Sequence, residues 1–171
     1  MAAIVPNSLA NGPGLRNVYF SQGCSHQCKN CFNQSTWSFE GGRMCNIKEI
    51  IETLKKQVGY LDGVTFSGGD PFEQPEAFAE LAKAIHAMGV NIWAYTGYTF
   101  DELLEMGRHK PAVKVMLENI DVVVDGPYIE SQMDEHIMYR GSKNQRIVDV
   151  PSSLRENKVI VLNYDDMGMI K

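Results

Sequence analysis

The sequence predicts an α/β fold with a parallel sheet, and two observations support this prediction. Short apolar segments with the composition of buried strands occur at residues 18–22, 64–66, 90–95 and 122–124. Between them lie segments in which apolar residues recur every three or four positions, as on one face of a helix. Strands that alternate with helices in this way predict repeated βα units.

Start and stop signals define the predicted helices. Asn46 followed by Glu49 has the form of a capping box, and apolar residues then recur on one helical face as far as Val58. Pro75 opens a second helix, and Gly89 ends it. Further helices are predicted from Thr99 and Pro111, and further strands at residues 147–150 and 159–162.

Length and composition limit the classes of protein to consider. The chain has 171 residues, 44% of them hydrophobic, which predicts a single domain over residues 1–171. A net charge of -5 argues against a nucleic-acid partner. With no apolar stretch of membrane-spanning length and no signal peptide, we expect a cytoplasmic protein without a membrane partner.

Three cysteines with the spacing C-x3-C-x2-C form the strongest motif. Cys24, Cys28 and Cys31 follow the first predicted strand within eight residues. Iron–sulfur clusters bind thiolates, and three of them leave one iron of a [4Fe-4S] cubane open. A structural zinc site is the alternative, and its fourth ligand would have to be His26 or Cys45. We expect a solvent-facing histidine and a buried or free thiol there instead.

A glycine-rich turn offers a place for a ligand of the open iron. The segment Ser67-Gly68-Gly69-Asp70-Pro71 follows a predicted strand and precedes a predicted helix. Glycine lets a backbone approach a ligand closely, although a tight turn without a ligand would be built in the same way. Ligands of α/β proteins bind at the carboxyl ends of the strands, where both motifs lie.

Together these motifs resemble the radical S-adenosylmethionine superfamily, whose hallmark is C-x3-C-x2-C followed by a Gly-Gly-Glu or Gly-Gly-Asp turn. The blocks Asn-Gln-Ser-Thr-Trp at 33–37 and Arg-Gly-Ser-Lys-Asn-Gln-Arg at 140–146 narrow the resemblance. They are similar to blocks of anaerobic ribonucleoside-triphosphate reductase-activating proteins. Other similar blocks lie at residues 11–16, 65–71, 93–98 and 125–128.

The resemblance implies a fold, a reaction and partners. The fold would be a partial βα barrel with parallel strands. The enzyme would be a radical S-adenosylmethionine oxidoreductase, a glycyl-radical activase of the [formate-C-acetyltransferase]-activating type. It would use a [4Fe-4S] cluster to cleave S-adenosylmethionine reductively and install a glycyl radical on anaerobic ribonucleoside-triphosphate reductase. Its electron donor would be a protein such as flavodoxin or ferredoxin.

The resemblance also assigns roles to residues of this sequence. The three cysteines would ligate the cluster and so be the catalytic residues. Gly68, Gly69 and Asp70 would lie against the methionine amino group. Other residues expected to bind the cofactor are Thr96, Gly97, Asp125, Asn33 and Arg140. Arg140 could pair with the cofactor carboxylate or with acidic groups of the partner, or it could face solvent.

Four other functions compete with this hypothesis. The protein could activate a different glycyl-radical enzyme, or act by the same radical chemistry on a small molecule. It could also be a zinc-stabilised binding module, or a simple electron carrier. The shortness of the chain favours an activase, because a protein partner would have to close the open side of a partial barrel.

Overall fold

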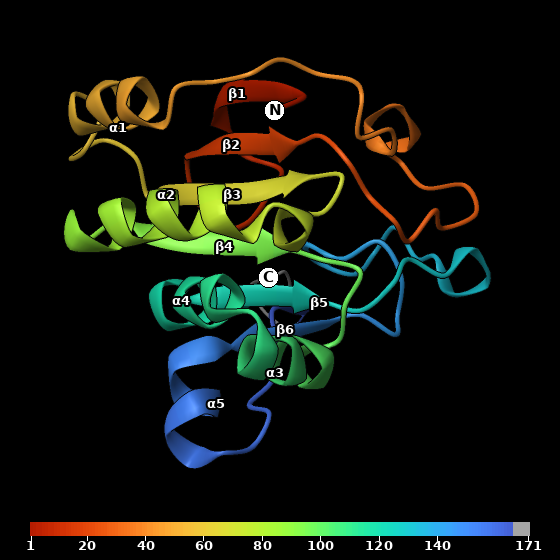
Figure 1. Ribbon diagram of the computed structural model, residues 1–171. Helices are drawn as coiled ribbons and strands as arrows, with labels where there is room; N and C mark the ends of the chain where they lie inside the picture. The colour runs from red at the N-terminus through yellow and green to blue at the C-terminus, as the bar shows by residue number, and fades with distance from the viewer. Residues whose placement is uncertain (166–171) are drawn as a thin grey trace, which may run out of the picture.

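The computed structural model describes residues 1–165 and contains, within them, an open six-stranded sheet and five α-helices (Figure 1). The strands lie side by side in chain order, which confirms the α/β class. They are β1 (Ala3–Ser8), β2 (Arg16–Ser21), β3 (Gly63–Gly68), β4 (Asn91–Tyr95), β5 (Val122–Asp125) and β6 (Arg146–Asp149).

The middle of the sheet is parallel, and its two edges are antiparallel. Strands β2 to β5 pair in parallel, whereas β1 and β6 pair antiparallel to their neighbours. The wholly parallel sheet predicted from the sequence is therefore wrong at both edges. Strand β1 was not predicted, because none of its residues is buried and it contains Pro6, which an edge strand tolerates.

Four of the five helices begin close to the predicted residues, and one of these four ends early. The helices are α1 (Ile47–Lys55), α2 (Pro75–Ala87), α3 (Phe100–His109), α4 (Pro111–Asn119) and α5 (Val150–Glu156), of which α5 was not predicted. The side chain of Asn46 caps α1, and Thr99 and Glu102 form a reciprocal capping box on α3. The predicted extension of α1 to Val58 is wrong, because turns follow Lys55 and Gly59 takes a φ of 109°.

The predicted strand at residues 159–162 is also wrong. This segment makes one isolated antiparallel bridge, between Val161 and Val148 of β6. Two backbone hydrogen bonds flank the bridge, from Asp149 to the Ile160 carbonyl and from Leu162 to the Ile147 carbonyl. A single bridge beside a four-residue strand is too short a pairing to form a regular ladder.

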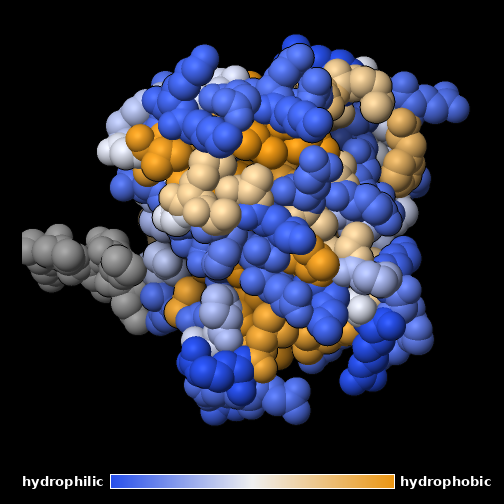
Figure 2. All heavy atoms as spheres, turned by 60° about the vertical axis from the view of Figure 1, so that its left-hand side comes forward, coloured by the Kyte–Doolittle hydropathy of each residue, from blue (hydrophilic) through white to orange (hydrophobic). Residues whose placement is uncertain are grey.

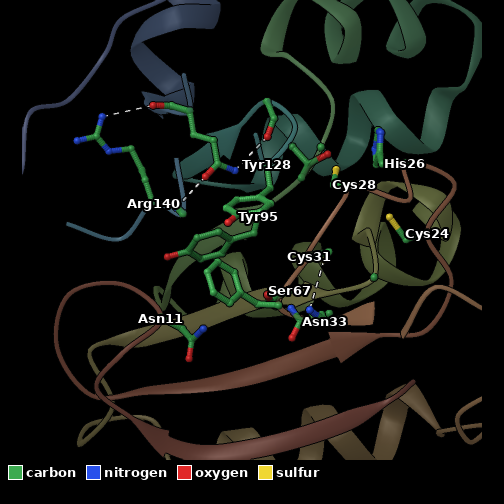
Figure 3. Close-up of a pocket in the computed structure, with 18 of the residues that line it drawn as sticks. Asn11, Cys24, His26, Cys28, Cys31, Asn33, Ser67, Tyr95, Tyr128 and Arg140 are labelled. Atoms are coloured by element: carbon green, nitrogen blue, oxygen red, sulfur yellow. Dashed lines mark hydrogen bonds between the residues drawn. The ribbon is translucent and has the colours of Figure 1, made fainter. Parts of the chain in front are cut away.

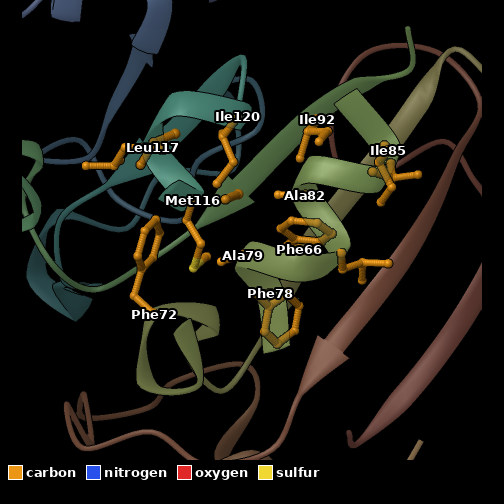
Figure 4. Close-up of a cluster of buried hydrophobic side chains, with 14 of the residues drawn as sticks. Phe66, Phe72, Phe78, Ala79, Ala82, Ile85, Ile92, Met116, Leu117 and Ile120 are labelled. Carbon is orange, nitrogen blue, oxygen red and sulfur yellow. The ribbon is translucent and has the colours of Figure 1, made fainter. Parts of the chain in front are cut away.

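The main core lies between the sheet and the helices that cover one of its faces (Figure 4). Phe66 of β3 is fully buried and packs edge-on against Phe78 of α2, with ring centroids 5.0 Å apart. Met116 and Ile120, in and just after α4, extend the same cluster. Because β2 to β5 run in the same direction, the loops that follow them all leave the sheet at the carboxyl ends of these strands (Figure 1).

Figure 2 brings forward the left-hand side of Figure 1, and this face is hydrophilic over much of its area, with apolar side chains between the polar ones. Within residues 1–165, no helix is long and apolar enough to cross a membrane.

Candidate functional site

The three clustered cysteines lie in a loop directly after β2, at the end of the sheet where the parallel strands have their carboxyl ends. The loop is closed at its base, because the Gly23 amide donates to the Thr36 carbonyl at 2.8 Å and the Cys24 amide to the Trp37 carbonyl at 3.0 Å. Cys24 is buried, and Cys28 and Cys31 are partly buried; all three are free thiols. Their placement confirms that the motif follows a strand at its carboxyl end.

The thiols occupy two different environments within this loop. Burial raises the pKa of the Cys24 thiol to about 11, so a bound cation is needed to favour its thiolate. Cys31 accepts a hydrogen bond from the Asn33 amide at 3.4 Å, and its own amide donates to the Cys28 carbonyl at 3.0 Å. Amide donors of this kind stabilise metal-bound sulfur.

Cys45 lies apart from this loop. It packs at the border of the main core just before α1, and its thiol donates to the Arg43 carbonyl at 3.8 Å. It lines a separate pocket between β1, β2 and α1. The prediction of a buried or free thiol agrees with this placement, since Cys45 is free and partly buried.

A single pocket of about 480 Å³ unites the predicted motifs (Figure 3). Its volume is in the range typical of small-molecule sites. In Figure 3, Cys24, Cys28 and His26 lie at one end and Arg140 lies at the other. The predicted site residues that line it are Cys24, Cys28, Cys31, Asn33, Gly68, Gly69, Thr96, Gly97 and Arg140.

The donor set fits a [4Fe-4S] cluster. Among residues 1–165, no three His, Cys, Asp or Glu side chains converge closely enough to hold a single metal ion. A cubane takes one thiolate per iron atom, so its ligands line one pocket rather than converge on one point. Cys24, Cys28 and Cys31 meet this requirement, and they could hold such a cluster.

The glycine turn after β3 is pressed against the base of the cysteine loop. The Gly69 amide donates to the Ser21 carbonyl at 3.0 Å, and the Asp70 amide donates to the Gly23 carbonyl at 2.9 Å. Gly68 has a φ of 104°, and a Cβ on Gly69 would meet the Gly23 carbonyl. Glycine is therefore required at both positions, and the turn brings its backbone to the pocket wall.

The carboxylate of Asp70 points into the protein, so the structure does not bring this side chain to the pocket wall. Asp70 is fully buried. One oxygen accepts from the Phe72 amide at 2.9 Å. The other accepts from His26 Nε2 at 2.9 Å, Thr96 Oγ1 at 2.8 Å and the Gly97 amide at 2.9 Å. Four donors thus satisfy a buried charge that would otherwise be costly.

His26 does not face solvent, and the expectation that it does is wrong. Its hydrogen bond to Asp70 raises its pKa, against the opposing effect of burial. Its ring contacts the Tyr98 ring edge-on, with centroids 4.4 Å apart. This role could not be predicted from the sequence, because the partner carboxylate lies 44 residues further along the chain.

Glu73 is a second carboxylate that binds the cysteine loop, and sequence reasoning missed it. It accepts hydrogen bonds from the hydroxyl and the amide of Ser25, and from the Tyr98 hydroxyl at 3.0 Å. Burial works to raise the pKa of Glu73, but these hydrogen bonds outweigh it and hold the pKa below its usual range. Its place three residues after Asp70 is the only signal that could have suggested it.

Asp125 is buried and also does not reach the pocket wall. Its carboxylate accepts from the Phe100 amide at 2.7 Å, at the start of α3, and from Nε of Arg146 at 3.1 Å. A second bond from Arg146, at 2.5 Å, completes a bidentate pair that raises the pKa of this arginine. Asp125 therefore joins β5, β6 and α3 behind the pocket.

Arg140 lies at the far end of the pocket from the cysteines. Its guanidinium donates to the Gln145 carbonyl at 3.3 Å and pairs with the Asp165 carboxylate. Its Nε is buried, and no hydrogen-bond partner for it is found among residues 1–165. Gln145 and Asp165 thus hold the guanidinium in position, and Nε is left without an acceptor among the described residues.

Residues 10–148 match the protein family described as a 4Fe-4S single cluster domain, and the chain belongs to that family. Its similarity to curated proteins then narrows the assignment. It is 36% identical over 151 residues to the anaerobic ribonucleoside-triphosphate reductase-activating protein of Enterobacteria phage T4, an alignment that covers 84% of this chain and 90% of the relative. The chain thus belongs to the family of anaerobic ribonucleoside-triphosphate reductase-activating proteins.

Two bacterial relatives with the same name support this assignment. The Haemophilus influenzae protein is 38% identical over 150 residues, which cover 83% of this chain and 92% of the relative. The protein of Escherichia coli K12 is 33% identical over 148 residues, which cover 82% and 92% of the two chains. The similarity therefore extends over nearly the whole length of these relatives.

Proposed function

We propose that this protein is a radical activase. It cleaves S-adenosylmethionine reductively on a [4Fe-4S] cluster and installs a glycyl radical on anaerobic ribonucleoside-triphosphate reductase. The observation that supports this function best is the shared pocket, in which Cys24, Cys28 and Cys31 face the turn of Gly68 and Gly69. The names of the relatives support the choice of partner.

Cys24, Cys28 and Cys31 would hold the cluster by three of its irons, which would leave the fourth open to S-adenosylmethionine. When bound and reduced, the cluster would supply the electron for reductive cleavage of S-adenosylmethionine to methionine and, after a hydrogen atom is taken from a glycine of the reductase, 5'-deoxyadenosine. One electron is consumed per activation, and we propose a small donor protein such as flavodoxin or ferredoxin as its source.

Backbone groups and a few side chains around the pocket would hold S-adenosylmethionine. The backbone of Gly68 and Gly69 lies at the pocket wall, where it could contact the methionine end. Asn33 and Thr96 are polar residues of the pocket wall, and the buried Nε of Arg140 has a hydrogen to donate to a carboxylate. For Asp70 and Asp125 we propose supporting roles, since their carboxylates are bonded inside the protein.

The exposure of the loop favours a protein substrate over a small molecule. Cys28 and Cys31 are only partly buried, and the Phe32 side chain beside them is 74% exposed. A glycine of a second protein could reach a cluster held this close to the surface. The open sheet also agrees with a partial barrel whose open side the reductase covers.

The first test is anaerobic reconstitution with iron and sulfide, followed by reduction with dithionite in the presence of S-adenosylmethionine. Chromatography should then detect 5'-deoxyadenosine and methionine in equal amounts. Cys28→Ala should abolish both the cluster and the cleavage. Cys45→Ala is the matched control and should retain both, because this thiol lies outside the pocket.

A second step tests the partner. Activated protein mixed with anaerobic ribonucleoside-triphosphate reductase should give the electron paramagnetic resonance signal of a glycyl radical. Uptake of zinc in place of the cluster, with no cleavage, would support a zinc-stabilised binding module instead. Cleavage without a glycyl radical on this reductase would leave another glycyl-radical enzyme or a small molecule as the substrate.

A further inference from the structure

Two carboxylates after the glycine turn bind consecutive residues of the cysteine loop. Asp70 accepts from His26 Nε2 at 2.9 Å, and Glu73 accepts from the amide of Ser25 at 3.3 Å and from its hydroxyl. Ser25 and His26 lie between Cys24 and Cys28 in the sequence. The spacing of the first two thiols is therefore set by contacts that involve neither sulfur nor metal.

The bond between His26 and Asp70 joins three parts of the site at one oxygen atom. The same oxygen accepts from Thr96 and from the Gly97 amide, both just after β4. A Cβ on Gly97 would meet the His26 ring, so glycine lets the backbone lie against the imidazole. A carboxylate only accepts, so His26 must carry a hydrogen on Nε2. That nitrogen is therefore not available as an iron ligand.

We infer that His26 is a positioning residue: by donating to Asp70 it holds the segment from Cys24 to Cys28 in the conformation that accepts the cluster, and holds it beside Gly97. This inference rests on the cluster of the proposed function. Ordering a loop costs conformational entropy, and a loop ordered by its own protein contacts binds its ligand more tightly. His26 thus lowers the cost of assembling the cluster.

The test compares His26→Ala, which removes the donor, with His26→Gln, whose amide can still donate to Asp70. His109→Ala is the matched control, because His109 pairs with Glu105 at 3.2 Å on the exposed surface of α3. Hydrogen exchange is measured on the metal-free chain in peptides that contain residues 24–31 and 96–98. Exchange should be about tenfold faster in His26→Ala, near the unmodified rate in His26→Gln, and unchanged in the control.

Iron loading supplies an independent readout. In an anaerobic titration with limiting iron and sulfide, His26→Ala should bind the cluster about tenfold more weakly than His26→Gln, as followed by the visible absorbance of the cluster. If the alanine variant does not fold, His26→Asn replaces it, because its shorter amide does not reach Asp70.

Two results would overturn the inference. The first is unchanged exchange together with unchanged iron loading in His26→Ala. The second is a glutamine variant as impaired as the alanine variant, since the hydrogen bond would then not be the cause. If unmodified protein with a full cluster releases no 5'-deoxyadenosine, the proposed reaction fails, whereas the exchange and loading results still decide the role of His26.

Discussion

The two halves of the cysteine loop are anchored in different ways. Ser25 and His26, in the first half, bind Glu73 and the fully buried Asp70. In the second half, Lys29 pairs with Glu130 at 3.0 Å in an exposed ion pair. The comparison shows that only the first half is fixed by the interior of the protein, because exposed pairs contribute little to stability.

The second half of the loop is also the more open to a partner. Asn30 takes a φ of 56°, a left-handed conformation that asparagine tolerates, and its side chain donates to Glu130. Phe32 is largely exposed and contacts the ring of Tyr128 at 5.2 Å between centroids. We therefore expect the first half to hold the geometry of the site and the second half to adapt to the reductase.

Replacing the buried carboxylate should have the largest effect. Asp70→Ala leaves four donors without their acceptor, and we expect a loss of about 3–5 kcal/mol in the free energy of unfolding. Urea denaturation of the metal-free chain measures it. The control is Asp62→Ala, an exposed carboxylate that accepts one amide, from Leu15, and should cost about 1 kcal/mol. Equal losses in the two variants would show that the buried carboxylate of Asp70 stabilises the protein no more than an exposed carboxylate does.

Loading the cluster should abolish the difference between the two halves, because all three thiols are then tied to one rigid group. Binding at a hundred times the dissociation constant adds about 2.7 kcal/mol. For a chain of this size we expect the melting temperature to rise by about 5–10 °C. Hydrogen exchange should become equally slow on both sides of Cys28, and a chelator should restore the difference. Persistent fast exchange after Cys28 would show that the second half does not hold iron.

Removing the second carboxylate of the first half should have an intermediate effect. Glu73→Ala breaks the hydrogen bonds to Ser25 and Tyr98, and we expect a loss of about 1–2 kcal/mol in urea denaturation. Glu80→Ala, on an exposed part of α2, is the control and should stay within about 0.5 kcal/mol of the unmodified chain. A Glu73 variant as stable as this control would leave Asp70 as the sole anchor.

The smallest effect is expected at the exposed anchor. Glu130→Ala should leave the urea midpoint unchanged within experimental scatter, because Lys29 remains solvated without its partner. Exchange of residues 29–31 should nevertheless become faster, since Asn30 also loses its acceptor. A drop in the midpoint as large as that of Glu73→Ala would show that both halves are anchored alike.

Features carried by neighbouring residues were predictable. The cysteine spacing, the turn around Gly68 and the helix opened by Pro75 are all local patterns, and the structure has each of them in the predicted place. The pocket that unites them was also expected, because parallel strands bring their following loops to one edge. Local chemistry therefore located the site.

Partners that are distant in sequence were not predictable. His26 and Asp70 are 44 residues apart, and Asn30 and Glu130 are 100 apart. Asp125 was expected to line the cofactor, and its pairing with Arg146 depends on the antiparallel edge strand β6. The edge strand β1 escaped prediction because an exposed strand lacks a buried periodic face.

The sequence by itself determined four of the five helices, the parallel centre of the sheet and the three thiols, because each depends on residues a few positions apart. Only the tertiary structure decided that Asp70 and Asp125 bond inside the protein instead of lining the pocket, and that Asp70 and Glu73 hold the cysteine loop. The physical reason is that a buried carboxylate such as Asp70 accepts from the donors that packing brings to it. The pairing of β2, β3 and β4 brings it His26, which precedes it in the sequence, and Gly97, which follows it.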